Sequence, residues 1–151
     1  MKFRVAVSLD VKLSGLQPRI LTNRETADRV CTALSLLLFD LVEAAAFFDP
    51  SKSLSTGVEV RKAEPGDEFA TLLLRDGGTP EFHLTTRDLE NILAFVLRYC
   101  RDGYGAVDHV DIEASVVGRD GESYYFTVAV AEAAAPVTPE EARRRLGLRD
   151  A

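Results

Sequence analysis

A row of polar side chains in the last third of the chain has the residue types that could do chemistry. His109, Asp111, Glu113 and Ser115 alternate with apolar residues, and this period of two predicts a strand that directs all four to one face. His83 also lies between apolar residues and is expected to face outward from its strand. If the two strands are neighbours, two imidazoles and two or three carboxylates share one face. Such a set of donors suits a divalent metal, or a general base with the acid that orients it.

The simpler interpretation of this row is a solvated sheet face. The outer face of an antiparallel sheet is expected to be polar, and side chains two residues apart on a strand are about 7 Å from each other. Residues at that spacing rarely converge on one ion without a third element. A metal-binding protein or metal-dependent enzyme is therefore the alternative function, with His83, His109, Asp111 and Glu113 as candidate metal ligands.

No nucleophile motif or phosphate loop accompanies the polar row. The sequence has no Gly-x-Ser-x-Gly, and neither Cys31 nor Cys100 has a histidine near it in the chain. The expected strand-to-helix junctions, at residues 21–23 and 84–86, contain no glycine that could cradle a phosphate. We therefore expect no catalytic residue and no cofactor, and a binding protein rather than an enzyme.

The longest expected element is a helix from about Asn23 to Phe48. Thr22 followed by Glu25 is typical of a helix start, and Pro50 stops the helix. Most residues outside a narrow polar stripe are apolar, although a helix lying on one sheet needs an apolar stripe only about 100° wide. The remaining apolar surface must be covered by a second helix or by a second subunit.

Strands and shorter helices account for the rest of the chain. Thr85 and Thr138, each followed by an acid three residues later, predict the starts of two helices. The expected elements besides the long helix are strands over 3–13, 57–63, 69–75, 80–84, 110–116 and 124–130, and helices over 86–101 and 138–146. We predict an α+β fold with a mostly antiparallel sheet of five to six strands, two long helices packed on one face and a short C-terminal helix. Residues 1–151 form a single domain, in which 131–151 are a linker and the short terminal helix.

The last hairpin is expected to have a three-residue loop, 119–121. This loop places Val116 opposite Tyr124 and Ile112 opposite Val128, so that the apolar partners share one face. The glycine that ends the loop takes its left-handed position.

Composition and charge exclude several classes of function. The net charge is -6 and the pI is about 5.0, so the surface repels phosphate backbones and no nucleic acid is expected as a partner. The N-terminal pattern alternates and lacks the apolar run of a signal peptide. The longest apolar stretch, Leu36–Phe39, is too short to cross a bilayer. Cys31 and Cys100 are expected to be buried free thiols of a cytoplasmic protein with no membrane partner.

Protein binding is the function that these observations predict. The order helix, three strands, helix, two strands, helix, over about Asn23 to Leu146, is similar to that of small acidic secretion chaperones. Excess apolar helix surface and missing catalytic groups predict a non-catalytic intracellular protein-binding module, immunity-like or chaperone-like, that forms a homodimer. The partner is another protein, a second copy, or both. The expected partner-binding residues are Leu36, Phe39, Phe47, Phe48, Phe95 and Tyr99.

Overall fold

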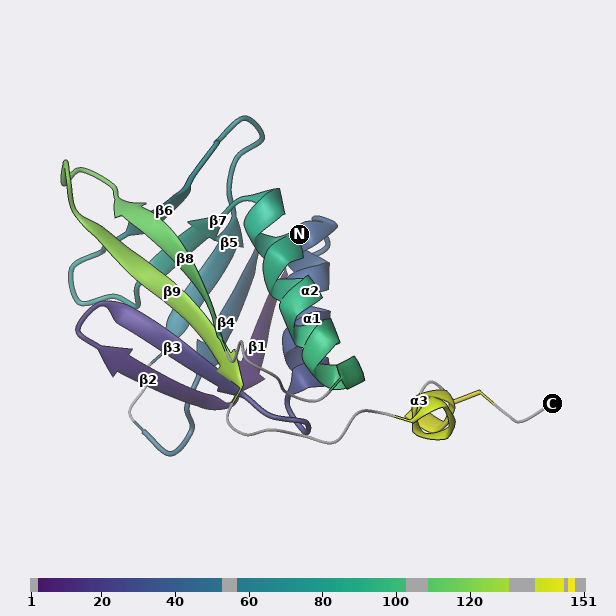
Figure 1. Ribbon diagram of the computed structural model, residues 1–151. Helices are drawn as coiled ribbons and strands as arrows, with labels where there is room; N and C mark the ends of the chain where they lie inside the picture. Colours follow the sequence, from purple (N-terminus) through teal and green to yellow (C-terminus); the bar gives the residue numbers. More distant parts are fainter. Residues whose placement is uncertain (1–2, 53–56, 103–108, 131–137, 146, 149–151) are drawn as a thin grey trace.

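The computed structural model describes residues 3–52, 57–102, 109–130, 138–145 and 147–148. In chain order the elements are β1 (Arg4–Ser8), β2 (Asp10–Ser14), β3 (Gln17–Thr22), α1 (Ala27–Leu38), β4 (Ala44–Phe48), β5 (Val58–Lys62), β6 (Ala70–Leu73), β7 (Glu81–Leu84), α2 (Thr86–Asp102), β8 (His109–Val116), β9 (Ser123–Val130) and α3 (Pro139–Arg145). Within these residues, nine strands form one sheet in the order β1, β4, β5, β7, β6, β8, β9, β3, β2. The sheet is curled, and α1 and α2 lie side by side against it (Figure 1).

The predicted α+β class is confirmed, but the predicted sheet and helices are wrong. The sheet has nine strands rather than five to six. It is mixed rather than mostly antiparallel, because β1 with β4, β3 with β9, β5 with β7, and β6 with β8 are parallel pairs. Parallel pairs join segments that are distant in the sequence, so the turn signals that reveal hairpins do not reveal them. The prediction of two long helices also fails, since α1 has only 12 residues.

The segment predicted as one helix, from Asn23 to Phe48, contains both the helix α1 and the strand β4. The helix ends at Leu38, and Asp40 has a φ of 58°, a left-handed conformation that turns the chain away from the helix axis. Residues 44–48 form β4, which lies between β1 and β5 and has buried or half-buried residues throughout. A strand covered on both faces is a continuous apolar run and cannot be distinguished by periodicity from a buried helix.

This division removes the excess apolar surface that the sequence suggested. α1 buries Ala27, Val30, Ala33, Leu34 and Leu37, and it contacts both the sheet and α2. The helix is therefore covered within the chain by the sheet and a second helix. The apolar residues of β4 belong to the sheet and need no further cover.

Local signals for helix starts succeed at two of three sites. The Thr85 hydroxyl accepts the backbone N–H of Asp88, and the Asp88 carboxylate accepts the backbone N–H of Thr85 (3.1 and 3.0 Å). The Thr138 hydroxyl accepts the N–H of Glu141 at 3.2 Å. Thr22 is wrong as a cap, because it is fully buried in β3 and Asn23 instead accepts the N–H groups of the next turn.

The register predicted for the last hairpin is wrong by two residues. Ala114 lies opposite Tyr124, and Ile112 lies opposite Phe126. The connection is longer than predicted and contains two left-handed glycines, Gly118 (φ 82°) and Gly121 (φ 80°), of which the second was predicted. A shift by two residues keeps every side chain on the same face, so the apolar pattern alone does not separate the two registers.

The two outer strands of the sheet are consecutive in the chain, and this forces the sheet to curl. β1 ends at Ser8 and β2 begins at Asp10, yet they lie at opposite ends of the strand order. The alternation noted from residue 3 to 13 continues through the bend, because Val7, Leu9 and Val11 are all buried. One continuous segment therefore borders β4 with its first half and β3 with its second half.

Candidate functional site

The backbone of β1 is bonded on only one side by the described residues. The N–H of Leu9 donates to the carbonyl of Phe48 at 3.1 Å. Successive residues of a strand direct their N–H and C=O groups to alternate sides, so the odd-numbered residues of this segment face β4. The N–H and C=O groups of Arg4, Ala6 and Ser8 face the opposite edge, where no described residue forms a hydrogen bond with them. These three residues are called the open edge below.

Further along the segment, β3 occupies the same side as the open edge. β2 and β3 form a hairpin in which Ser14 pairs with Gln17 across a two-residue turn, so the even-numbered residues of β2 bond to β3. The first of them is Asp10, which pairs with Leu21. The chain leaves β3 at Thr22 and continues into α1. The open edge therefore borders a gap in the curled sheet. This gap ends at β3 and is flanked by α1.

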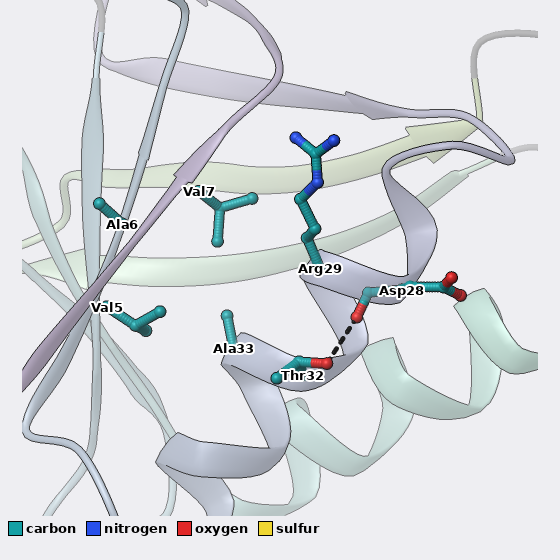
Figure 2. A pocket seen from close by; sticks show the side chains of 7 residues that line it. All are labelled: Val5, Ala6, Val7, Asp28, Arg29, Thr32 and Ala33. Carbon is teal, nitrogen blue, oxygen red and sulfur yellow. Dashed lines mark hydrogen bonds between the residues drawn. The ribbon is translucent and has the colours of Figure 1, made fainter. Parts of the chain in front are cut away.

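A cleft of about 260 Å³ lies between the open edge and α1. Its lining residues are Val5, Ala6, Val7, Asp28, Arg29, Thr32 and Ala33. Figure 2 shows the apolar side chains of β1 on one side and the polar side chains of α1 on the other. The cleft thus combines backbone that no described residue bonds with apolar and charged side chains.

Arg29 is the cation of this cleft. Its side chain is exposed and extends from α1 toward the end of β1 that carries Val7, while Asp28 points in another direction (Figure 2). Among the described residues it has no ion-pair partner, whereas Arg24, five residues earlier, is paired with Glu141 at 3.3 Å. The guanidinium of Arg29 is therefore available to an anionic group that enters the cleft.

The other outer strand is protected, in contrast to β1. The ammonium of Lys52 donates to the carbonyl of Val11 at 3.0 Å, on the side of β2 that faces away from β3. Lys52 also pairs with Asp49 (Nζ to Oδ2, 3.6 Å). Lysine at a sheet edge is a known device against further strand pairing. No comparable side chain covers the open edge of β1 among the described residues.

Three large apolar side chains are exposed near the start of β1. Phe3, Phe39 and Leu41 are 59%, 71% and 62% exposed. The carbonyl of Phe3 accepts the N–H of Glu43 at 2.8 Å, which brings the start of β1 beside the connection that follows α1. This apolar patch was only partly expected, because Phe39 alone among its members was predicted to contact a partner.

The structure distributes the six predicted partner-binding residues between surface and core. Phe39 is exposed, and Leu36, Phe48 and Phe95 are half-buried. Phe47 and Tyr99 are each only 1% exposed and pack inside the molecule. Helical periodicity placed Phe47 on an outer helix face, but it lies on β4 with its side chain in the core.

The predicted polar row on β8 does face outward. His109 and Asp111 are 3.5 Å apart (Nε2 to Oδ2). Asp111 also accepts the hydroxyl of Thr127, and Glu113 accepts the hydroxyl of Ser123 at 2.8 Å. The carboxylates are thus engaged by neighbouring hydroxyls of β9 on the same face of the sheet.

His83 does not join this row. It lies on β7, and β6 separates β7 from β8. Thr71 of β6 pairs with His83 on one side and with Ser115 on the other, so His83 lies level with Ser115 and far along the sheet from His109. In the described parts of the chain, no three histidine, cysteine, aspartate or glutamate side chains are grouped as a metal site would require.

His83 instead belongs to a charged network on the outer face of the sheet. Its Nε2 lies 2.8 Å from Oε1 of Glu81, whose side chain is only 5% exposed. Arg61 and Arg75 lie 3.1 and 3.5 Å from the same carboxylate. The Nε of Arg61 lies off the hydrogen-bonding direction, so that contact is ionic only. Arg61 also reaches Glu59 at 3.4 Å, so the network extends across the adjacent strands β5 and β7.

None of the described helices is both long and apolar enough to cross a membrane. Comparison of the chain with protein-family models, with curated proteins and with solved structures finds no match. The open edge and its cleft therefore have to be interpreted from their own geometry.

Proposed function

We propose that this chain is a non-catalytic protein-binding module that accepts an extended segment of another polypeptide on the open edge of β1. The observation that carries the proposal is that no described residue forms a hydrogen bond with the outward-facing backbone groups of Arg4, Ala6 and Ser8. An extended segment that enters the gap would form main-chain hydrogen bonds with these residues and become a further strand. Such bonds give affinity without requiring a particular sequence.

The cleft beside the open edge supports this proposal. In an added strand, alternate side chains point to opposite faces, so every second side chain would enter the cleft. There it would contact Val5 and Val7 of β1 and Ala33 of α1. Pockets for alternate side chains are the usual source of specificity in strand addition.

Self-association is a separate part of the proposed function. The apolar patch formed by Phe3, Phe39 and Leu41 exposes large side chains at one end of β1 and α1. Grouped apolar side chains on a surface are typical of protein contacts. The homodimer predicted from the sequence therefore stays a prediction, with this patch as its contact in place of a fully apolar helix.

Selection of displayed peptides tests the proposed binding. Random peptides, displayed with free C-termini, are selected on the wild-type protein, and the strongest binders are then measured against two variants. Ala6→Pro removes an N–H from the open edge and places a ring in the gap, yet leaves the bonds between β1 and β4 in place. Ala6→Thr changes the exposed side chain at the same position and keeps the N–H.

We expect the selected peptides to keep measurable binding to Ala6→Thr, which retains the N–H, and to lose binding to Ala6→Pro. The circular dichroism spectra of both variants serve as the check that the fold is kept. Peptides that bind Ala6→Pro as well as wild type would show that the open edge is not the binding site.

A further inference from the structure

We infer that the segment held at the open edge is the free C-terminus of a polypeptide, running parallel to β1, with its terminal carboxylate between the guanidinium of Arg29 and the N–H of Ser8. This inference rests on the proposed function and adds to it the direction and the chemistry of the partner. Three features of the gap lead to it.

The first feature is that the gap is closed at one end. From Asp10 onward, β3 occupies the side of the segment that Arg4, Ala6 and Ser8 leave open. An extended segment that follows the open edge toward Ser8 would therefore meet β3 and could not continue straight. It must end there or turn sharply, and a chain terminus satisfies this limit with no turn.

The second feature is the charge at the closed end. Arg29 extends toward the Val7 end of β1 (Figure 2) and has no ion-pair partner among the described residues. A segment antiparallel to β1 would bring its N-terminal ammonium to this guanidinium, which is repulsive. A parallel segment brings its terminal carboxylate there instead. Arginine and backbone N–H groups are strong donors to carboxylates, and the N–H of Ser8, the next residue after Val7, lies on the open side of β1.

The third feature is that the other polar groups of the cleft do not compete for this position. Asp28 points away from the guanidinium of Arg29 (Figure 2). The hydroxyl of Thr32 donates to the carbonyl of Asp28 at 2.8 Å and is thus already engaged. The remaining lining is small and apolar, so a side chain next to the terminus should be small and apolar as well.

Each selected peptide is synthesised in two forms that differ only at the end of the chain, one with a free carboxylate and one with a carboxamide. Affinities of both forms are measured by fluorescence anisotropy on wild type and on Arg29→Gln. The matched control is Arg87→Gln, which removes an exposed arginine from the first turn of α2, away from this cleft.

We expect the free acid to bind wild type roughly fivefold to tenfold more tightly than the carboxamide. Arg29→Gln should remove this difference by weakening the acid form alone, and Arg87→Gln should leave it unchanged. Equal binding of both forms to wild type, or a preference that survives Arg29→Gln, overturns the inference. The proposed function still stands in either case if Ala6→Pro abolishes binding. Failure to select any peptide, or binding that ignores Ala6→Pro, overturns both.

Discussion

Cys31 illustrates how one side chain reports the packing between the two helices. It lies on α1, is half-buried and carries a free thiol. Burial raises its pKa to about 11, and the nearby Cys100 and Asp28 add to the effect. A thiol with such a pKa is almost entirely protonated at neutral pH, so it is a poor nucleophile.

We expect Cys31 to react slowly with iodoacetamide. In a Cys100→Ser variant, where Cys31 is the one remaining thiol, alkylation at pH 8 should be at least roughly tenfold slower in the folded protein than in urea. Mass spectrometry over time gives both rates. Equal rates would mean that Cys31 is not buried between α1 and α2.

Asp49 carries a pH dependence at the protected edge. Its carboxylate accepts the hydroxyl and the N–H of Ser51 (2.6 and 3.0 Å), and these bonds, with help from Lys52, lower its pKa below the ordinary 3.8. The unfolded chain therefore takes up the proton at higher pH than the folded one. The resulting stabilisation is present above about pH 3.8 and is lost as the pH falls through the lower, folded-state pKa.

The wild type should accordingly exceed Asp49→Asn in free energy of unfolding at neutral pH, and this advantage should shrink as the pH falls below 3.8. Urea unfolding at a series of pH values measures it. An advantage that stays constant down to the most acidic pH would contradict the lowered pKa.

At the scale of elements, β4 is where the structure differs most clearly from the sequence-based expectation. Phe47 is in the core at 1% exposure, whereas Phe39, just after α1, is 71% exposed. Phe47→Ala should therefore lower the free energy of unfolding by about 3–5 kcal/mol. Phe39→Ala should change it by about 0.5 kcal/mol or less. Urea denaturation compares the two, and similar losses for both would support a single long helix instead.

Local signals were sufficient for part of the fold. The cap made by Thr85 and Asp88 depends on residues three apart, and it was read correctly. The N-terminal alternation also gave the correct inward face for Val7, Leu9 and Val11, although Phe3 is exposed. The sequence did not predict β4, because its five residues have no polar alternation. It did not predict the parallel pairs either, because no turn links their strands.

The candidate site was beyond sequence reasoning for a related reason. The open edge exists because β1 pairs with β4, some forty residues away, and because the chain bends at Leu9 from one end of the sheet to the other. In the sequence, nothing distinguishes Arg29 from an ordinary solvated residue on a helix. Only the bend and the pairing place it beside the open edge. The alternative of a metal site required the strands that carry His83 and His109 to be neighbours, but β6 separates them.

At the scale of the whole molecule, the apolar patch predicts the oligomeric state. Sedimentation velocity of the wild type at micromolar concentration should show a dimer, because Phe3, Phe39 and Leu41 are exposed together. A Phe39→Ser, Leu41→Ser variant should be a monomer with an unchanged circular dichroism spectrum. A monomeric wild type would remove self-association and leave the open edge untouched.

Among the described residues, β1 is bonded on one side only, and amide hydrogen exchange of the isolated protein tests most directly whether its other side is free. NMR resolves the exchange rate of each residue. We expect the N–H groups of Arg4, Ala6 and Ser8 to exchange rapidly, and those of Val5, Val7 and Leu9, which face β4, to be strongly protected. Equal protection of both sets would show that the open edge is already bonded and that no strand can be added there.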